Sequence, residues 1–202
     1  AADSPSFKLR ATGSPFESKD VLKARGYRWD AEAKVWFCTL ADAQRLRADV
    51  FGAEYGVSFA EGIDADRLDA FCDHLNVYDV ANGLLIATTR LLSREKARLA
   101  GGFYSAGEFD LSALIAQSAP GRQLLELGRS CVAPEWRTSA TISLLWRGIA
   151  TYLAQHGIGH LFGCASLHGA DETLHLAELS WLYHTLLAPP ALRAASSPKT
   201  WG

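Results

Sequence analysis

The chain has 202 residues, of which 49% are hydrophobic, 10% aromatic and 21% charged, and this composition excludes wholesale disorder and fibrous repeats. Its 20 lysines and arginines against 22 aspartates and glutamates give a formal net charge of -2, which argues against nucleic acid as a partner. At a typical size of about 150 residues per domain, the length predicts one full-sized domain with a small appendage.

The start of the chain, AADSPS, has neither a basic region nor an apolar core, so we expect no signal peptide. No apolar run approaches the roughly 18 residues that a membrane span needs. The cysteines form no CxxC pair and stand far apart, at Cys38, Cys72, Cys131 and Cys164. We therefore expect buried free thiols in a cytoplasmic protein.

The first elements form a polar appendage followed by a strand and a helix. Residues 1–33 are rich in turn-forming serine, proline and glycine, and we expect the appendage there. The aromatic run KVWFCTL over residues 34–40 predicts the first strand of the main domain. Apolar residues then cluster on one helical face over residues 41–51, with Leu46, Val50 and Phe51 together.

A hairpin is the clearest feature of the next segment. Residues 74–80 and 84–92 read as strands, and Asn82-Gly83 predicts a two-residue turn between them. Strands and helices then alternate: a helix after Asp110, a strand over 123–132 ended by Pro134, a helix over 139–156, a strand over 160–166, and a helix over about 171–187 stopped by Pro189-Pro190. This order predicts an α/β fold with a mixed, mostly antiparallel sheet flanked by helices.

Two runs resemble the GNAT superfamily, in the branch of bacterial N-acyltransferases that make the lyso form of ornithine lipid and are related to acyl-homoserine-lactone synthases. They are LLELGRSCVAPEWR from Leu124 and SLLWRGIATYLAQHGIGHLFGCASL from Ser143. The family's shorter motifs are matched at Arg47 and Phe51 in R-x-x-V-F, at Asp64, Asp66 and Asp69 in D-x-D-x-x-D, at Arg90 at the end of the hairpin, and at Glu126 and Arg129 in E-x-x-R. The resemblance implies a GNAT-like acyltransferase domain over residues 34–193 and a tail over 194–202.

The resemblance implies transfer of a fatty, 3-hydroxy type of acyl group from acyl carrier protein to the α-amine of ornithine or a similar amino acid. Glu126 is the candidate general base, with Arg129 beside it, because the amine must lose a proton before it attacks. On a strand, Glu126 and Gly128 face one side while Leu125 and Leu127 face the other, so we expect the carboxylate in a cleft. The alternative is a structural ion pair between Glu126 and Arg129.

The resemblance places the other motif residues around the amino-acid substrate. The acidic triplet Asp64, Asp66 and Asp69 suits a cationic amine. The alternatives are a solvated loop in which Asp64 caps a helix, and an ordinary amphipathic helix with Phe51 in the core and Arg47 in solvent. Arg90 has its own alternative, a plain charge at the end of a strand.

The resemblance implies no bound cofactor, and an acyl-phosphopantetheine thioester as co-substrate. The family's phosphate loop, Q/R-x-x-G-x-G/A, is replaced here by RTSATI from Arg137 to Ile142, which fits one phosphate better than a coenzyme A diphosphate. Arg137, Thr138 and Ser139 are the phosphate candidates. The alternative is that Ser139 is only a helix N-cap and Arg137 a surface charge.

Carrier proteins are acidic, so their docking surface should be basic, and Arg94, Lys96, Arg98, Arg122 and Arg147 are candidates. We expect no metal site, because His156, His160, His175 and His184 follow no ligand spacing. Family members usually continue with strands that wall the amine pocket. Either a partner subunit completes the site or the site is incomplete, and a homodimer and a peripheral contact with the inner membrane both stay open.

Three other functions stay open beside direct acyl transfer to the amine. The chain could make a signal lactone from S-adenosylmethionine, or be a non-catalytic fold that binds carrier protein. A third alternative passes the acyl group through Cys164 or Cys131 with His168 as activating base. We prefer direct attack because Cys164 is expected as a small core residue in the strand over 160–166.

Overall fold

The computed structural model describes residues 28–30, 35–37, 40–79, 83–117, 119, 122–167, 169 and 171–196. Most of the expected appendage, the tail after Ser196, and the residues Cys38, Asn82 and His168 lie outside these ranges. Within them, no helix is both long and apolar enough to cross a membrane.

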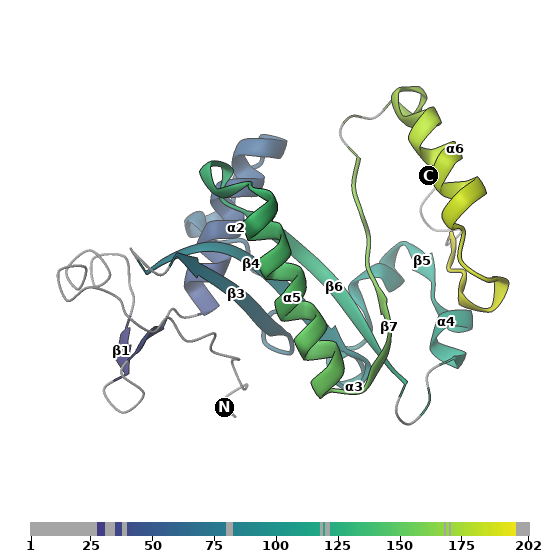
Figure 1. Ribbon diagram of the computed structural model, residues 1–202, viewed down its shortest axis with the longest axis horizontal. Helices are drawn as coiled ribbons and strands as arrows, with labels where there is room; N and C mark the ends of the chain where they lie inside the picture. Colours follow the sequence, from purple (N-terminus) through teal and green to yellow (C-terminus); the bar gives the residue numbers. More distant parts are fainter. Residues whose placement is uncertain are drawn as a thin grey trace.

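The centre of the fold is a four-stranded sheet in the order β3-β4-β6-β7 (Figure 1). Its strands are β3 (Asp73–Asp79), β4 (Leu84–Ser93), β6 (Gln123–Val132) and β7 (Ile158–Phe162). The β3–β4 and β4–β6 pairs are antiparallel and the β6–β7 pair is parallel. The predicted mixed and mostly antiparallel sheet is therefore confirmed.

The hairpin between β3 and β4 has a longer loop than the sequence predicts. Asp79 pairs with Leu84, so four positions separate the paired strand ends instead of the two that the expected turn needs, and Asn82 itself lies outside the described residues. Gly83 has φ 63°, in the left-handed region that glycine adopts without steric cost.

One face of the sheet is covered by α5 (Ser139–Gln155), which crosses it in Figure 1. The helix buries one residue per turn, at Thr141, Leu145, Ile149 and Tyr152, which is the spacing of a single helical face. Leu145, Ile149 and Tyr152 pack with Leu75, Val77, Leu91 and Leu125 from three strands. This face of the sheet therefore holds an apolar core.

The opposite face is covered by α2 (Leu40–Tyr55), α3 (Arg94–Leu99) and α4 (Ser112–Ala116), together with short turns. The turns are η2 (Ala60–Gly62) and η3 (Tyr104–Gly107). Around α3 and α4 this face is apolar, with Leu68, Cys72, Phe103, Leu111 and Leu124 in one cluster. Beside α2 it is charged, and the candidate site lies there.

Two small sheets lie outside the central one. β1 (Arg28–Asp30) pairs with β2 (Val35–Phe37), so the strand expected over residues 34–40 joins a neighbour from the expected appendage and not the central sheet. The other small sheet pairs β5 (Phe109–Asp110) with β8 (Ala195–Ser196), which ties the C-terminal segment back to the domain.

The C-terminal segment contains η5 (Glu172–His175), α6 (Leu176–Leu186) and η6 (Pro190–Leu192). α6 stands away from the sheet in Figure 1 and has no buried residue. Its exposed apolar side chains include Leu176, Leu179, Trp181, Leu182, Tyr183 and Leu186. β7 ends at Phe162, four residues before the predicted end at 166, so Cys164 is exposed beyond the strand and the expected core position is wrong.

Candidate active site

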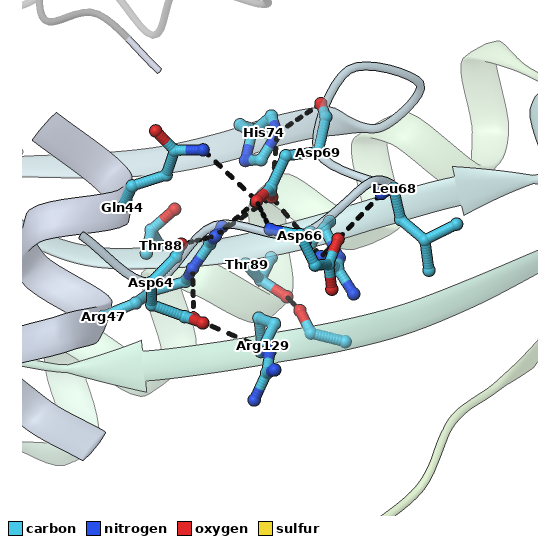
Figure 2. Close-up of polar contacts among 12 residues, drawn as sticks. Gln44, Arg47, Asp64, Asp66, Leu68, Asp69, His74, Thr88, Thr89 and Arg129 are labelled. Atoms are coloured by element: carbon cyan, nitrogen blue, oxygen red, sulfur yellow. Dashed lines mark hydrogen bonds and ion pairs between the residues drawn. The ribbon is translucent and has the colours of Figure 1, made fainter. Parts of the chain in front are cut away.

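Six charged residues meet between α2, the loop over residues 63–72, and strands β4 and β6. They are Arg47, Asp64, Asp66, Asp69, Arg90 and Arg129, and we call them the arginine–aspartate network (Figure 2). Arg47, Asp64, Asp69 and Arg90 are each at most 4% exposed. Charged groups of this kind lie in a protein interior only when they are paired.

Arg47 is the centre of the network, and Figure 2 shows it between two aspartates. Its Nε donates to Asp64 Oδ2 at 2.9 Å, and its Nη2 donates to Asp69 Oδ1 and Oδ2 at 3.0 and 2.9 Å. At 1% exposed, Arg47 is the buried residue of the R-x-x-V-F motif and Phe51 is only half-buried. The alternative with Arg47 in solvent and Phe51 in the core is therefore wrong.

The Asp69 carboxylate accepts hydrogen bonds from Gln44, Arg47 and the Asp66 amide. Burial alone would raise the pKa of this carboxyl, but hydrogen bonds from Arg47 and the Asp66 amide, the charge of Arg47 and a bond from Gln44 outweigh it and lower the pKa. Arg90 Nη1 donates to Asp66 Oδ1 at 2.8 Å and lies 3.4 Å from Asp69 Oδ1. Arg90 is thus built into the network, and its alternative as a plain strand-end charge is wrong.

The network contains three arginines and three aspartates, so its formal charges cancel. Asp64 and Asp69, two of the three aspartates expected around a cationic substrate, are buried and already paired with Arg47. The solvated-loop alternative is wrong for the same two residues because both are buried. Asp66 is the accessible member, with its side chain 27% exposed.

Beside the network, burial lowers the pKa of His74, whose Nε2 lies 3.3 Å from the Asp69 carbonyl oxygen.

Arg129 enters the site through a β-bulge in β6. Thr88 pairs with Cys131 and Arg90 pairs with Gly128, so Arg129 and Ser130 together oppose the single residue Thr89. Arg129 has φ 51°, a left-handed conformation that is uncommon outside glycine. A bulge of this kind turns a side chain away from the strand's alternation, and here it brings Arg129 Nε to 3.6 Å from Asp64 Oδ2 while the end of the guanidinium points away.

The Arg129 guanidinium lies between two aromatic rings. Its central carbon is 5.8 Å from the Phe51 ring centroid and 5.7 Å from that of Tyr104. Its Nε is 3.6 Å from Asp64 Oδ2, an ion-pair distance that is too long for a hydrogen bond. The alternative ion pair between Arg129 and Glu126 is therefore replaced by an ion pair with Asp64.

Glu126 has the predicted orientation but not the predicted environment. Leu125 packs with α5 while Leu124 packs on the opposite side, which confirms that Glu126 faces away from α5. However, Glu126 is 3% exposed and both its oxygens accept hydrogen bonds. Tyr104 N donates to Oε2 at 2.7 Å, and Ser105 donates to Oε1 from its N at 2.7 Å and its Oγ at 2.5 Å.

A general base needs an accessible oxygen within reach of the proton that it takes. Glu126 has its oxygens occupied by the turn η3, so the expected open cleft at this carboxylate is wrong. In this structure the carboxylate fixes the backbone of Tyr104, whose ring contacts Arg129. Sequence reasoning missed Tyr104 and Ser105 because they lie 22 and 21 residues from Glu126 in the chain, in a loop without a motif.

β6 and β7 separate next to this region. Their pairing ends at Glu126 and Phe162, although β6 continues to Val132. Gly163 follows immediately, and a Cβ atom there would lie 2.3 Å from the Leu127 carbonyl oxygen. β6 is therefore no longer paired with β7 beyond Glu126.

The phosphate candidates lie where η4 (Pro134–Trp136) leads into α5. Thr138, not Ser139, is the N-cap, and its hydroxyl accepts a hydrogen bond from Thr141 N at 3.2 Å. Arg137 donates from Nε to the Val132 carbonyl at 3.1 Å and forms an ion pair with Glu54. The N-terminus of this long helix can receive an anion, and Arg137 already has a carboxylate partner.

The two buried cysteines do not support a covalent route, and His168, the expected activating base, lies outside the described residues. Burial raises the pKa of Cys72 and of Cys131 to about 12, so both are protonated thiols at neutral pH. Cys164 is exposed and its Sγ donates to Ser105 Oγ at 3.1 Å. Among the residues with described positions, no group of three or more His, Cys, Asp and Glu side chains is arranged to hold a metal ion.

A family model described as an acetyltransferase (GNAT) domain matches residues 46–147, about half of the chain. The chain belongs to the GNAT family. The matched part of this GNAT domain begins in α2 and ends in α5, so it contains the arginine–aspartate network, the bulge at Arg129 and Glu126.

Curated relatives of this GNAT domain are named L-ornithine N(alpha)-acyltransferase. The one from Brucella abortus is 46% identical over 156 residues, 72% of this chain and 55% of that protein. The one from Agrobacterium fabrum is 41% identical over 169 residues, 79% of this chain and 57% of that protein. The chain thus spans a little over half the length of these relatives. A solved structure, the AHL synthase LasI, is 21% identical with a TM-score of 0.45, covering 61% of this chain and 63% of that one.

Proposed function

We propose that this GNAT domain transfers a fatty acyl group, of the 3-hydroxy type, from the thioester of acyl carrier protein to the α-amine of ornithine or a similar amino acid. The observation that carries the proposal is the 38–46% identity to proteins named L-ornithine N(alpha)-acyltransferase. The matched residues include the motif residues from Arg47 to Arg129.

The separation of β6 and β7 supports a thioester donor. β7 ends at Phe162 while β6 continues to Val132, so β6 beyond Glu126 is no longer paired with β7, and an extended pantetheine arm would lie along this edge. The phosphate at the end of that arm would lie at the N-terminus of α5, near Thr138 and Ser139. Arg137 would have to exchange Glu54 for the phosphate.

The chemistry needs no covalent enzyme intermediate. An α-amine has a pKa of about 8, so at pH 7 it first releases one proton to water. Its nitrogen then attacks the thioester carbonyl carbon, and strand amides of β6 stabilise the oxyanion that forms. Collapse of the tetrahedral intermediate completes the C–N bond and breaks the C–S bond, and the second proton of the amine ends on the departing sulfur. Glu126 acts here as a positioning residue that holds Tyr104.

An acidic carrier protein needs exposed basic residues for docking. Lys96 is already engaged, because its Nζ lies 2.5 Å from Asp73 Oδ1. Arg98, Arg122 and Arg147 are exposed and are the better candidates.

The test is to incubate the 202-residue chain with 3-hydroxyacyl carrier protein and ornithine and to identify the products by mass. We expect N-acylornithine and free carrier thiol in equal amounts, with unchanged turnover in Cys164→Ala. A lactone formed only with S-adenosylmethionine would instead indicate a signal-lactone synthase. Carrier binding without turnover would indicate a non-catalytic fold, and an acyl adduct trapped on Cys164 would contradict direct attack.

A further inference from the structure

Arg129 differs from the other arginines of the network in how its charge is satisfied. Arg47 and Arg90 donate to carboxylates at 2.8 to 3.0 Å and are at most 4% exposed. The Arg129 side chain is 33% exposed, and its closest carboxylate contact is the ion pair at 3.6 Å. Among the described residues, its guanidinium has no hydrogen-bond partner, and in Figure 2 it points away from the aspartates.

The left-handed backbone conformation of Arg129, which gives the side chain this orientation, costs free energy. A side chain other than glycine in the left-handed region costs about 1 kcal/mol or more, and such positions persist where the surroundings impose them. Here the bulge is fixed by the Thr89 hydroxyl, which lies 2.7 Å from Ser130 Oγ. The strained residue thus presents an incompletely paired cation on β6, beyond the last residue that pairs with β7.

The two aromatic rings restrict the approach to this cation. Phe51 and Tyr104 flank the guanidinium at nearly equal distances. Rings at these distances attract a cation and leave part of it accessible, since the Arg129 side chain is 33% exposed. A planar guanidinium binds a carboxylate through two parallel hydrogen bonds.

We propose that Arg129 binds the α-carboxylate of the acceptor amino acid, with Phe51 and Tyr104 as the walls of this subsite. The inference rests on the proposed function and deepens it, because the position at which the carboxylate binds decides which amine of the acceptor reacts. The α-amine is separated from the carboxylate by one carbon, whereas the δ-amine of ornithine lies three methylenes further away. A carboxylate held at Arg129 therefore keeps the α-amine next to the point where β6 and β7 separate.

The test compares ornithine with ornithinamide, in which a neutral amide of similar size replaces the carboxylate. For the wild-type chain and for Arg129→Gln, kcat/KM is measured with each acceptor. The affinity of each protein for ornithine and for ornithinamide is measured by calorimetry in the absence of the donor. We expect Arg129→Gln to lower kcat/KM for ornithine by about 100-fold, as for loss of a charged pair, and to change ornithinamide less than about threefold. Arg129→Lys should recover part of the loss because it keeps the charge but not the planar fork.

Glutamine and lysine bear the same left-handed backbone cost as arginine, so neither variant relieves the bulge. Arg45→Gln, at an exposed arginine of α2 that pairs with Asp42, is the matched control and should leave both acceptors unchanged. Equal losses for both acceptors in Arg129→Gln would overturn the inference, and so would equal binding of both acceptors by the wild-type chain. If the wild-type chain prefers ornithine in calorimetry but acylates neither acceptor, the proposed function fails while the carboxylate subsite stands.

Discussion

Arg47 is the residue on which the buried charges of the GNAT domain depend. One guanidinium with a side chain 1% exposed satisfies both Asp64 and Asp69. Bringing such charges out of water is costly, and the network compensates this cost only while every partner is present. Arg47 therefore contributes to stability mainly because its loss would leave the buried carboxylates of Asp64 and Asp69 unpaired.

Replacing Arg47 with methionine keeps much of the volume but removes the shared cation. We expect Arg47→Met to lower the free energy of unfolding by about 3–5 kcal/mol, measured by urea denaturation, because two buried carboxylates lose their main partner. Arg45→Met is the control, since that arginine is exposed and its loss should cost less than about 1 kcal/mol. Equal losses in the two variants would show that the network does not stabilise the fold.

The Glu126 carboxylate stabilises the turn η3 by accepting hydrogen bonds from Tyr104 and Ser105. In Glu126→Gln an amide N–H₂ must face a backbone or hydroxyl donor of Tyr104 or Ser105, so we expect a loss of about 1–3 kcal/mol in unfolding free energy. Displacement of the Tyr104 wall should lower kcat/KM by about tenfold.

The pH profile distinguishes positioning from proton transfer. For a positioning residue the profile of kcat/KM keeps its shape in Glu126→Gln, whereas loss of its acidic limb would restore the role of general base. Glu108→Gln, at an exposed glutamate that follows the same turn, is the control and should change stability by less than about 0.5 kcal/mol.

Among the helices and strands, the end of the β6–β7 pairing is the feature on which the proposed donor site depends. Parallel pairing ends at Glu126 and Phe162, and Gly163 then packs against the carbonyl of Leu127. A backbone carbonyl cannot rotate away as a flexible side chain can. The close approach of Gly163 to β6 therefore depends on a residue without a Cβ atom.

Gly163→Ala should displace one strand from the other. A Cβ atom 2.3 Å from the Leu127 oxygen forces a backbone shift, which we expect to cost about 1–3 kcal/mol of stability and to weaken binding of acyl carrier thioester in titration calorimetry. Gly128→Ala on the adjacent strand is the control, since its Cβ would meet no atom within 4 Å. If both alanine variants bind the thioester as the wild-type chain does, the junction is not the donor site.

At the scale of the whole molecule, the two faces of the sheet are stabilised differently. α5 covers an apolar core, while α2 covers a charged network. The C-terminal segment follows neither pattern: α6 has no buried residue, and the segment returns to the domain through the short β5–β8 pair.

Hydrogen exchange should separate these parts. Amides of α6 exchange through local opening, because opening exposes no buried apolar surface, while amides of β4 need global unfolding. We expect α6 to exchange at least about 100-fold faster than β4 in native buffer, measured by mass spectrometry of peptides. Equal protection of the two elements would show that α6 is packed in solution.

The sequence by itself determined the order of strands and helices, the family motifs, and the face on which Glu126 lies. These features depend on local spacing: a period of two along β6, one buried residue per turn in α5, and proline after Val132. The boundaries of β6 and the start of α5 agree with the sequence prediction because turn residues mark both.

Only the tertiary structure decided how the charges are paired. Arg47 meets Asp64 and Asp69 across 17 and 22 residues of chain, and Glu126 meets Tyr104 across 22. No local spacing encodes such contacts, so the sequence alone could not show that Arg47 pairs with the acidic triplet or that Tyr104 and Ser105 bind Glu126. The bulge at Arg129 is also a product of pairing, because an extra residue exists only relative to the opposite strand.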